Sequence, residues 1–192
     1  MSNIKLAIVG ATGAVGREFL RILAEQQFPA ENLFLVASSK SAGKAIKYFE
    51  KIIEIEDLQL FDFSKASVAF FSAGSSVAES HASQAIEKGC TVIDNSSFFR
   101  NRDDLELIVP EVNGSRLEDL NLPAIIANPN CSTAQMVVAL KPFHDLFKIR
   151  RVDVATYQSV SEQDNQPLKN LKNNREKFSM VKNILIMFTQ CK

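Results

Sequence analysis

The sequence predicts an α/β fold in which helices cover both faces of a doubly wound, mostly parallel sheet. Short apolar runs alternate with segments of helical spacing along most of the chain, and a glycine-rich turn joins the first run to the first such segment. Polar residues follow the predicted strands. A chain of 192 residues that is 46% hydrophobic can form one good domain, or one domain with an appendage.

The first predicted strand and helix flank a candidate phosphate-binding turn. An apolar run at residues 4–9 leads into GATGAVG at residues 10–16, and an amphipathic segment with Phe19, Leu20 and Leu23 follows. Glycines let the backbone approach a diphosphate, whose charge then lies on free amides at the helix start. A plain glycine turn is the alternative. The position of the motif between strand and helix favours dinucleotide binding.

The second predicted strand, residues 33–37, ends near the adenosine ribose of any dinucleotide bound at this turn. The segment at residues 38–44 contains hydroxyls and two lysines but no acidic residue. An acid would repel a 2′-phosphate, whereas Lys40 and the serines bind one. NADP is therefore favoured over NAD, although a solvated Ser/Lys loop would have a similar sequence.

The later elements continue the alternation of strands and helices. Helical spacing at residues 77–88 ends at Gly89. Further strands are predicted at residues 68–72, 91–94, 124–127 and 152–160. Because the carboxyl ends of parallel strands meet at one edge of a sheet, five residues should face one crevice, namely Gly10, Ser38, Gly74, Asn95 and Cys131.

Cys131 lies between a turn-prone Pro129-Asn130 and a helix-like run that begins at Ser132. Amides at a helix N-terminus stabilise a thiolate and hold the oxyanion that forms when the thiolate attacks a carbonyl. Free cysteines are also among the most often buried residues, so simple packing is the alternative. The convergence of strand ends favours the nucleophile.

Charge and composition narrow the class of protein. Net charge is zero and no basic patch is interleaved with aromatic residues, which argues against nucleic acid as a partner. The apolar runs are shorter than the ~20 residues of a spanning helix, so no membrane association is expected. Residues 1–3 run directly into the first strand, which predicts no signal peptide. Cys90, Cys131 and Cys191 show neither metal-ligand nor paired spacing, which fits a reducing cytoplasm and no metal.

Six motifs between residues 4 and 161 together resemble the aspartate-semialdehyde dehydrogenases. They are GATGAVG at 10–16, SAG at 72–74, NSSFFR at 95–100, VPEVN at 109–113, NPNCST at 128–133 and TYQSVS at 156–161. The resemblance implies a Rossmann-like domain and NADPH-dependent reductive dephosphorylation of aspartyl 4-phosphate to aspartate semialdehyde. This reaction serves lysine, diaminopimelate, threonine and methionine biosynthesis in the cytoplasm. Members of the family form homodimers or larger assemblies.

The resemblance also implies roles for individual residues. Cys131 would form a thioacyl enzyme, Asn130 would position it, Arg100 would bind phosphate, and Gln158 would hold the substrate. An exposed loop charge is the alternative for Arg100, and an ordinary strand-end amide is the alternative for Gln158. The residues expected along the cofactor are Gly10, Thr12, Gly13, Ala14, Val15, Ser38, Lys40, Ser41, Ser72, Ala73, Gly74 and Asn95.

The chain departs from the family after Ser161. Members continue with Gly-Ala-Gly and a second domain that carries a catalytic His, a substrate-binding Arg and most of the dimer interface, whereas Glu162-Gln163-Asp164 follow here. Residues 1–161 are thus predicted to form the NADP-binding domain, and residues 162–192 a divergent, poorly ordered tail. The Lys and Asn bias of this tail suggests a shifted reading frame, which resequencing would test.

Neither histidine replaces the missing one. His144 follows Cys131 along one predicted helix, which separates the two by about 20 Å at ~1.5 Å per residue. Proton transfer needs hydrogen-bond reach. His81 is expected to be a satisfied structural residue. Without a histidine partner, Cys131 keeps only the activation by the helix N-terminus, and we predict little or no turnover and weak NADP binding. Two other functions stay open. One is a non-catalytic NADP-binding remnant, and the other is an N-acetyl-γ-glutamyl-phosphate reductase, against which NPNCST and NSSFFR argue.

Overall fold

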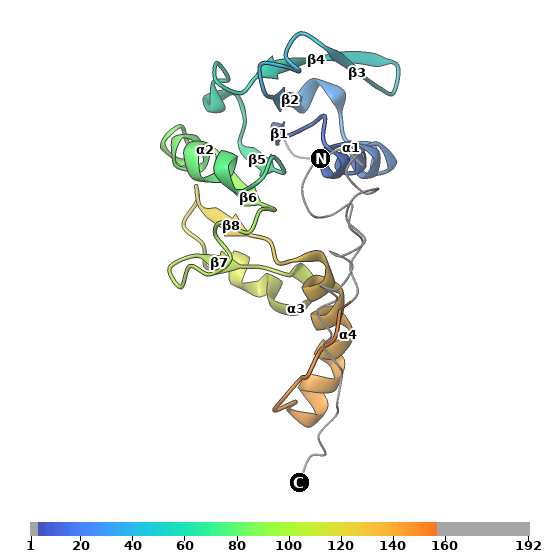
Figure 1. Ribbon diagram of the computed structural model, residues 1–192, viewed down its shortest axis with the longest axis vertical. Coiled ribbons are helices and arrows are strands. Elements are labelled where there is room, and N and C mark those ends of the chain that lie inside the picture. The colour runs from blue at the N-terminus through green and yellow to red at the C-terminus, as the bar shows by residue number, and fades with distance from the viewer. Residues whose placement is uncertain (1–3, 157–192) are drawn as a thin grey trace, which may run out of the picture. The chain divides into compact units, whose positions relative to one another are not determined.

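A computed structural model describes residues 4–156 of the chain. Residues up to Ala134 form one compact unit, and the residues from Gln135 onward belong to a second, which is described separately. The first unit contains an eight-stranded sheet with the strand order β3-β4-β2-β1-β5-β6-β8-β7 (Figure 1). The strands are β1 Leu6–Val9, β2 Leu33–Ala37, β3 Ala45–Tyr48, β4 Lys51–Asp57, β5 Val68–Phe71, β6 Thr91–Asp94, β7 Glu106–Leu107 and β8 Ile125–Ala127.

Every strand pair in this sheet is parallel except β3 with β4. The central strands are apolar along their whole length because both faces of the sheet are covered, as all four residues of β1 show by their burial. The chain starts at β1 in the middle of the sheet, moves outward to β2 and β4, and returns to the other side of β1 with β5. The predicted doubly wound, mostly parallel class is therefore confirmed.

Helices α1 (Ala14–Glu25) and α2 (Ser75–Glu87) lie on opposite faces of the sheet (Figure 1). Leu20 of α1 packs with Ile8 and Leu35 on one face. On the other face, Ala82 of α2 belongs to a core cluster with Phe71. Burying a side chain such as Phe71 or Leu35 stabilises the fold by about 1.5 to 3 kcal/mol. The short helix α3 (Pro110–Asn113) follows β7.

Helix α4 (Cys131–Phe147) begins in the first unit and continues into the second. The prediction of a strand at residues 152–160 is wrong for its described part, because residues 152–156 have no regular secondary structure. A strand needs a neighbour to accept and donate its backbone hydrogen bonds. Gln158, the other TYQSVS residues after Thr156 and the predicted tail at 162–192 lie outside the described residues.

Candidate active site at the carboxyl edge of the sheet

Backbone hydrogen bonds link the loops at the carboxyl ends of the central strands. The amide of Ser72 donates to the carbonyl of Val9 at 2.8 Å, and that of Asn95 donates to Phe71 at 2.9 Å. Two further bonds of the same kind join neighbouring strand ends, from Gly10 to Val36 and from Asn128 to Asp94. The residues that follow β1, β2, β5, β6 and β8 therefore meet at one edge of the sheet, as the sequence predicted.

The glycine turn is so tight that two of its three glycines have no room for a side chain. Gly10 has φ +92°, and a Cβ there would lie 2.9 Å from the carbonyl carbon of Ser72. A Cβ on Gly16 would lie 2.4 Å from the carbonyl oxygen of Gly10. Gly13 closes the turn, since its amide donates to the Gly10 carbonyl at 3.0 Å. Only glycine permits this close approach of turn, helix and neighbouring strand.

The start of α1 is suited to an anion. Its N-cap residue is Gly13, which offers no side-chain hydrogen bond, and the first turn contains no acidic residue. The backbone amides of the first turn have no partner within a helix. Ala14 and Val15 are exposed, and Thr12 is partly buried beside them. A diphosphate would therefore find free donors and the positive end of the helix dipole here.

The loop after β2 is exposed at Ser38 and Lys40, while Ser41 is partly buried. The amide of Ser41 donates to the carbonyl of Ser38 at 2.7 Å, which closes a turn. Sequence reasoning missed one acid near this loop. Asp57, the last residue of β4, pairs in register with Ala37, and its Oδ1 accepts a hydrogen bond from the amide of Gln59 at 3.0 Å. Only the position of β4 beside β2 reveals this neighbour.

The residues after β5 form the adjoining part of the edge. The Ser72 hydroxyl donates to the carbonyl of Val9 at 3.0 Å, so its side chain ties β5 to β1. Ala73 is exposed. Gly74 has φ +91° and is the N-cap residue of α2, and this conformation is one that other residues rarely adopt. Ser72, Ala73 and Gly74 thus lie next to the glycine turn.

Cys131 is the first residue of α4, and its side chain is exposed. The Oδ1 of Asn130 accepts hydrogen bonds from the Ser132 amide at 3.0 Å and from the Ser132 hydroxyl at 2.7 Å. Asn130 is therefore the side-chain cap of this helix. The Sγ of Cys131 lies 3.7 Å from the same oxygen. The cap fixes the thiol in the first turn, one residue earlier than the helix start that the sequence suggested.

Arg100 joins two strand ends. Its Nε donates to the carbonyl of Asn128 at 2.9 Å, and its Nη2 donates to the carbonyl of Asn95 at 2.9 Å. The Nδ2 of Asn128 donates to Oδ1 of Asn95 at 2.7 Å. This network holds the end of β6 against the segment that leads to Cys131. Sequence reasoning missed Asn128, although the residue is part of the NPNCST motif.

Beneath this network lies a buried carboxylate that sequence reasoning also missed. Asp94 is 0% exposed, and its two oxygens accept hydrogen bonds from the Ser96 amide at 3.0 Å and the Ser96 hydroxyl at 2.7 Å. These bonds shape the turn that presents Asn95. Cys90 lies at the opposite end of β6, directly before Thr91, where it is fully buried, and this burial raises the pKa of its thiol to about 11. Cys90 is therefore a packing residue, whereas the Cys131 side chain is exposed.

The two histidines do not join this constellation. His144 lies near the end of the continuous helix that begins at Cys131, which supports the argument that it is out of hydrogen-bond reach of the thiol. His81 is buried on α2, but the expectation that it is satisfied is wrong. Its Nδ1 has no hydrogen-bond partner among the described residues. Within residues 4–156, no group of His, Cys, Asp and Glu side chains is arranged to hold a metal ion. No helix in this range is long and apolar enough to cross a bilayer.

Comparison with known proteins gives relatives that match most of the chain. A family model described as "Semialdehyde dehydrogenase, NAD binding domain" matches residues 5–120. An aspartate-semialdehyde dehydrogenase of Legionella pneumophila is 51% identical over 159 residues, which are 83% of this chain and 46% of that protein. One from Campylobacter jejuni is 49% identical, with 82% of this chain and 46% of that protein covered. The chain thus spans about half the length of the curated relatives it matches.

Solved structures are similar as well. The aspartate semialdehyde dehydrogenase II of Vibrio cholerae, complexed with ASA, has a TM-score of 0.79 and is 46% identical. The similarity covers 84% of this chain and 53% of that one. The Candida albicans enzyme, solved with NADP, has a TM-score of 0.63 and is 28% identical, with 83% of this chain and 52% of that one covered.

Proposed function

Because the chain belongs to the semialdehyde dehydrogenase family, whose NAD-binding domain it contains, we propose that it carries the cofactor-binding and nucleophile part of an aspartate-semialdehyde dehydrogenase. The reaction is the NADPH-dependent reductive dephosphorylation of aspartyl 4-phosphate to aspartate semialdehyde. The observation that carries the proposal is the meeting of the glycine turn and Cys131 at the same edge of one sheet.

The residues of the turn fit a dinucleotide. A side chain at Gly10 would clash with the backbone of Ser72, so glycine keeps the turn close to the neighbouring strand end. The first turn of α1 offers the diphosphate backbone amides without a side-chain cap. In the proposal, the diphosphate is held by Gly10, Thr12, Gly13, Ala14 and Val15. Ser72, Ala73 and Gly74 lie along the cofactor, and Asn95 lies toward the nicotinamide.

NADP is the proposed form of the cofactor. Ser38, Lys40 and Ser41 offer two hydroxyls and a cation to a 2′-phosphate. Asp57 is the one nearby acid that the structure adds, and its Oδ1 is engaged by the Gln59 amide. The NADP in the Candida albicans relative supports the same assignment.

Cys131 is the proposed nucleophile. Its thiolate attacks the acyl carbon of aspartyl phosphate, a C–S bond forms, and the C–O bond to the phosphate breaks as phosphate leaves. The positive end of the α4 helix dipole would stabilise the oxyanion that develops. A nicotinamide bound in this site would supply the hydride that reduces the thioester, and the Cys131 thiolate would be the leaving group when aspartate semialdehyde is released. Asn130 holds the thiol in place through the cap of α4.

Arg100 is the proposed phosphate ligand. Its hydrogen bonds to two backbone carbonyls hold it in place for this role. Two of its nitrogens donate to the carbonyls of Asn128 and Asn95, which orients the planar fork. A phosphate would bind the remaining edge of the guanidinium, where Nη1 and the second N–H of Nη2 are donors. Gln158 remains the proposed substrate ligand on the strength of the family motif. We also propose a cytoplasmic location, since Cys90, Cys131 and Cys191 show no paired spacing in the sequence.

A direct assay tests the proposal. The full chain is incubated with aspartate semialdehyde, NADP and phosphate, and NADPH formation is followed by its absorbance, with Cys131→Ser as the control. Phosphate-dependent turnover that the substitution abolishes supports the proposal, even at a low rate. NADP binding, measured by calorimetry, without any turnover would favour the second candidate, a non-catalytic dinucleotide-binding module. A chain that binds no NADP contradicts both.

A further inference from the structure

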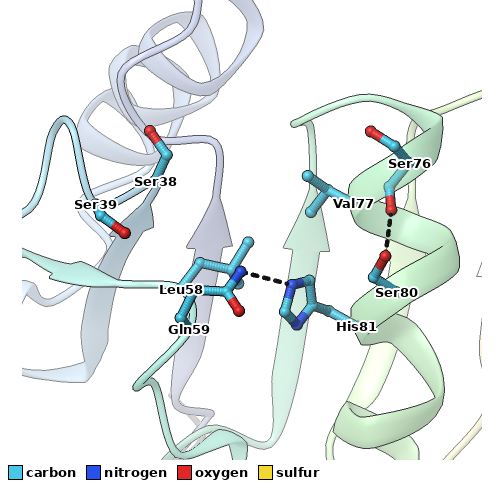
Figure 2. A pocket seen from close by; sticks show the side chains of 8 residues that line it. All are labelled: Ser38, Ser39, Leu58, Gln59, Ser76, Val77, Ser80 and His81. Carbon is cyan, nitrogen blue, oxygen red and sulfur yellow. Dashed lines mark hydrogen bonds between the residues drawn. The ribbon is translucent and has the colours of Figure 1, made fainter.

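A cavity of about 270 Å³ lies at the carboxyl edge of the sheet beside the loop that follows β2 (Figure 2). Three segments contribute to it, namely the start of the β2 loop, the turn after β4, and the first half of α2. The lining residues are Ser38, Ser39, Leu58, Gln59, Ser76, Val77, Ser80 and His81. All of them belong to the first unit. The volume is just below the ~300 to 1,000 Å³ of whole-ligand pockets, so the cavity suits one ring system of a larger ligand.

The lining of the cavity combines apolar walls with uncharged hydrogen-bonding groups. Leu58 and Val77 supply apolar walls, whereas hydroxyls, one carboxamide and one imidazole supply hydrogen-bonding groups. Among the described residues that line the cavity, none carries a fixed charge. A phosphate would therefore find no cation here. A flat, uncharged heterocycle with hydrogen-bonding edges matches these walls.

Gln59 and His81 face each other across this cavity (Figure 2). The Nε2 of Gln59 lies 3.3 Å from the Nε2 of His81. A carboxamide nitrogen can only donate, so this ring nitrogen accepts and the proton of the neutral imidazole lies on Nδ1. The remaining N–H and the Oε1 of Gln59 are then left on the other edge of its amide. That edge pairs with the N6 amine and a ring nitrogen of adenine.

The burial of His81 supports a role beyond packing. The residue is 8% exposed, and its Nδ1 has no hydrogen-bond partner among the described residues. A buried, unpaired N–H destabilises a fold, and an apolar ring would fill the same space without that cost. The imidazole of His81, unlike an apolar ring, provides an acceptor for the side-chain N–H of Gln59. The backbone of Gln59 is itself fixed, because its amide donates to Oδ1 of Asp57.

We propose that the Gln59 and His81 pair determines base specificity in this cavity. Gln59 binds the edge of the adenine of the dinucleotide, and His81 is a positioning residue that fixes the direction of the Gln59 amide. The proposal rests on the proposed function, because the cavity adjoins the strand end, at Ser38, where the adenosine ribose of a bound dinucleotide lies.

The test compares NADP with nicotinamide hypoxanthine dinucleotide phosphate, which carries an oxygen in place of the N6 amine. Calorimetry on the full chain should give about tenfold tighter binding of NADP, a factor within the range by which a bidentate amide pair discriminates. Gln59→Ala should weaken the binding of NADP by about tenfold and change the affinity for the hypoxanthine analogue by less than about twofold, so that the preference for NADP disappears. Gln59 is exposed, so this variant keeps the fold. The matched control is Gln84→Ala, an exposed residue of α2 that does not line the cavity and should keep the preference.

Variants of His81 separate positioning from packing. His81→Phe keeps the ring volume and should lose the preference between the two bases, because the Gln59 amide can then turn over. His81→Gln supplies a new acceptor and should restore at least part of the preference. Equal binding of both dinucleotides by the parent chain overturns the inference and leaves the proposed function intact. So does a preference that persists in Gln59→Ala. Failure to bind either dinucleotide overturns both proposals.

Discussion

Among single residues, Gly10 and Asn130 each have a structural role in the candidate site that most other residues could not fill. Gly10 combines a left-handed conformation with a Cβ position occupied by the Ser72 carbonyl. Asn130 is a different case, because its carboxamide oxygen satisfies the first turn of α4 and lies next to the thiol. Cys90 and Cys131 are chemically alike but differ in burial, and only the exposed Cys131 is accessible to a substrate.

Gly10→Ala should lower the free energy of unfolding by more than about 2 kcal/mol, since it adds both a strained φ and a clash with backbone atoms. Gly89→Ala is the matched control, because Gly89 also has positive φ (+81°) but nothing lies within 4 Å of its Cβ position. Urea denaturation measures both variants. Equal losses at the two positions would show that the close approach to Ser72 has no energetic effect.

Asn130→Ala should lower the free energy of unfolding by about 1 kcal/mol, because the Ser132 amide loses its side-chain acceptor. Asn130→Ser, which retains a capping oxygen, should recover most of this loss. Denaturant titrations of the three chains measure the effect. A serine variant as unstable as the alanine variant would contradict the capping role.

The Cys90 thiol should make stability depend on alkaline pH. Burial raises its pKa from 9.0 to about 11, so the folded chain keeps the proton at pH values where the unfolded chain has lost it. The resulting stabilisation is complete below pH 9.0 and disappears as the pH rises toward about 11, by about 2 to 3 kcal/mol in total. Unfolding curves over this range should fall more steeply for the parent chain than for Cys90→Ala. Parallel pH profiles would refute this assignment.

At the scale of elements, the edge of the sheet is held together by side chains that cross from one strand end to the next. Arg100 and Asn128 connect the ends of β6 and β8, and Ser72 connects β5 to β1. The strands supply the positions, and these bonds fix the loops that carry the proposed site residues. A loop held from two sides keeps its geometry when substrate binds.

Arg100→Lys should lower the free energy of unfolding by about 2 kcal/mol, because one ammonium cannot reproduce the fork that binds two carbonyls. The control is Arg116→Lys, whose exposed ion pair with Glu106 contributes less than about 1 kcal/mol. Chemical denaturation measures both. If the two variants were equally stable, Arg100 would have no clamping role and only its proposed phosphate contact would remain.

At the scale of the whole molecule, the predictable part of the fold is the buried part. β2 and β6 were predicted at their observed bounds because strands covered on both faces are continuously apolar. β3 and β4 were not predicted, since β3 is largely exposed and Ile52 of β4 is 76% exposed, so their sequences lack a clear burial pattern. Their pairing depends on the rest of the sheet, which a local pattern does not contain.

In the candidate site, too, the sequence pattern predicts some features, whereas others depend on contacts between distant residues. Gly10, Cys131 and the other strand-end residues could be predicted because a parallel sheet brings its carboxyl ends together. The bonds of Arg100 could not, since they join residues as far apart as Asn128 in the sequence. The Gln59 and His81 pair was also out of reach, because it depends on the turn after the unpredicted β4.

The central claim is that Cys131 and the nicotinamide dinucleotide share one cleft. The most direct measurement is the rate at which iodoacetamide alkylates Cys131, read by mass spectrometry of the peptide, with and without saturating NADP. Saturating NADP should slow alkylation severalfold, whereas adenosine 2′,5′-bisphosphate, which lacks the nicotinamide half, should leave the rate unchanged. An alkylation rate that saturating NADP does not alter, although calorimetry shows the dinucleotide to be bound, would contradict the account.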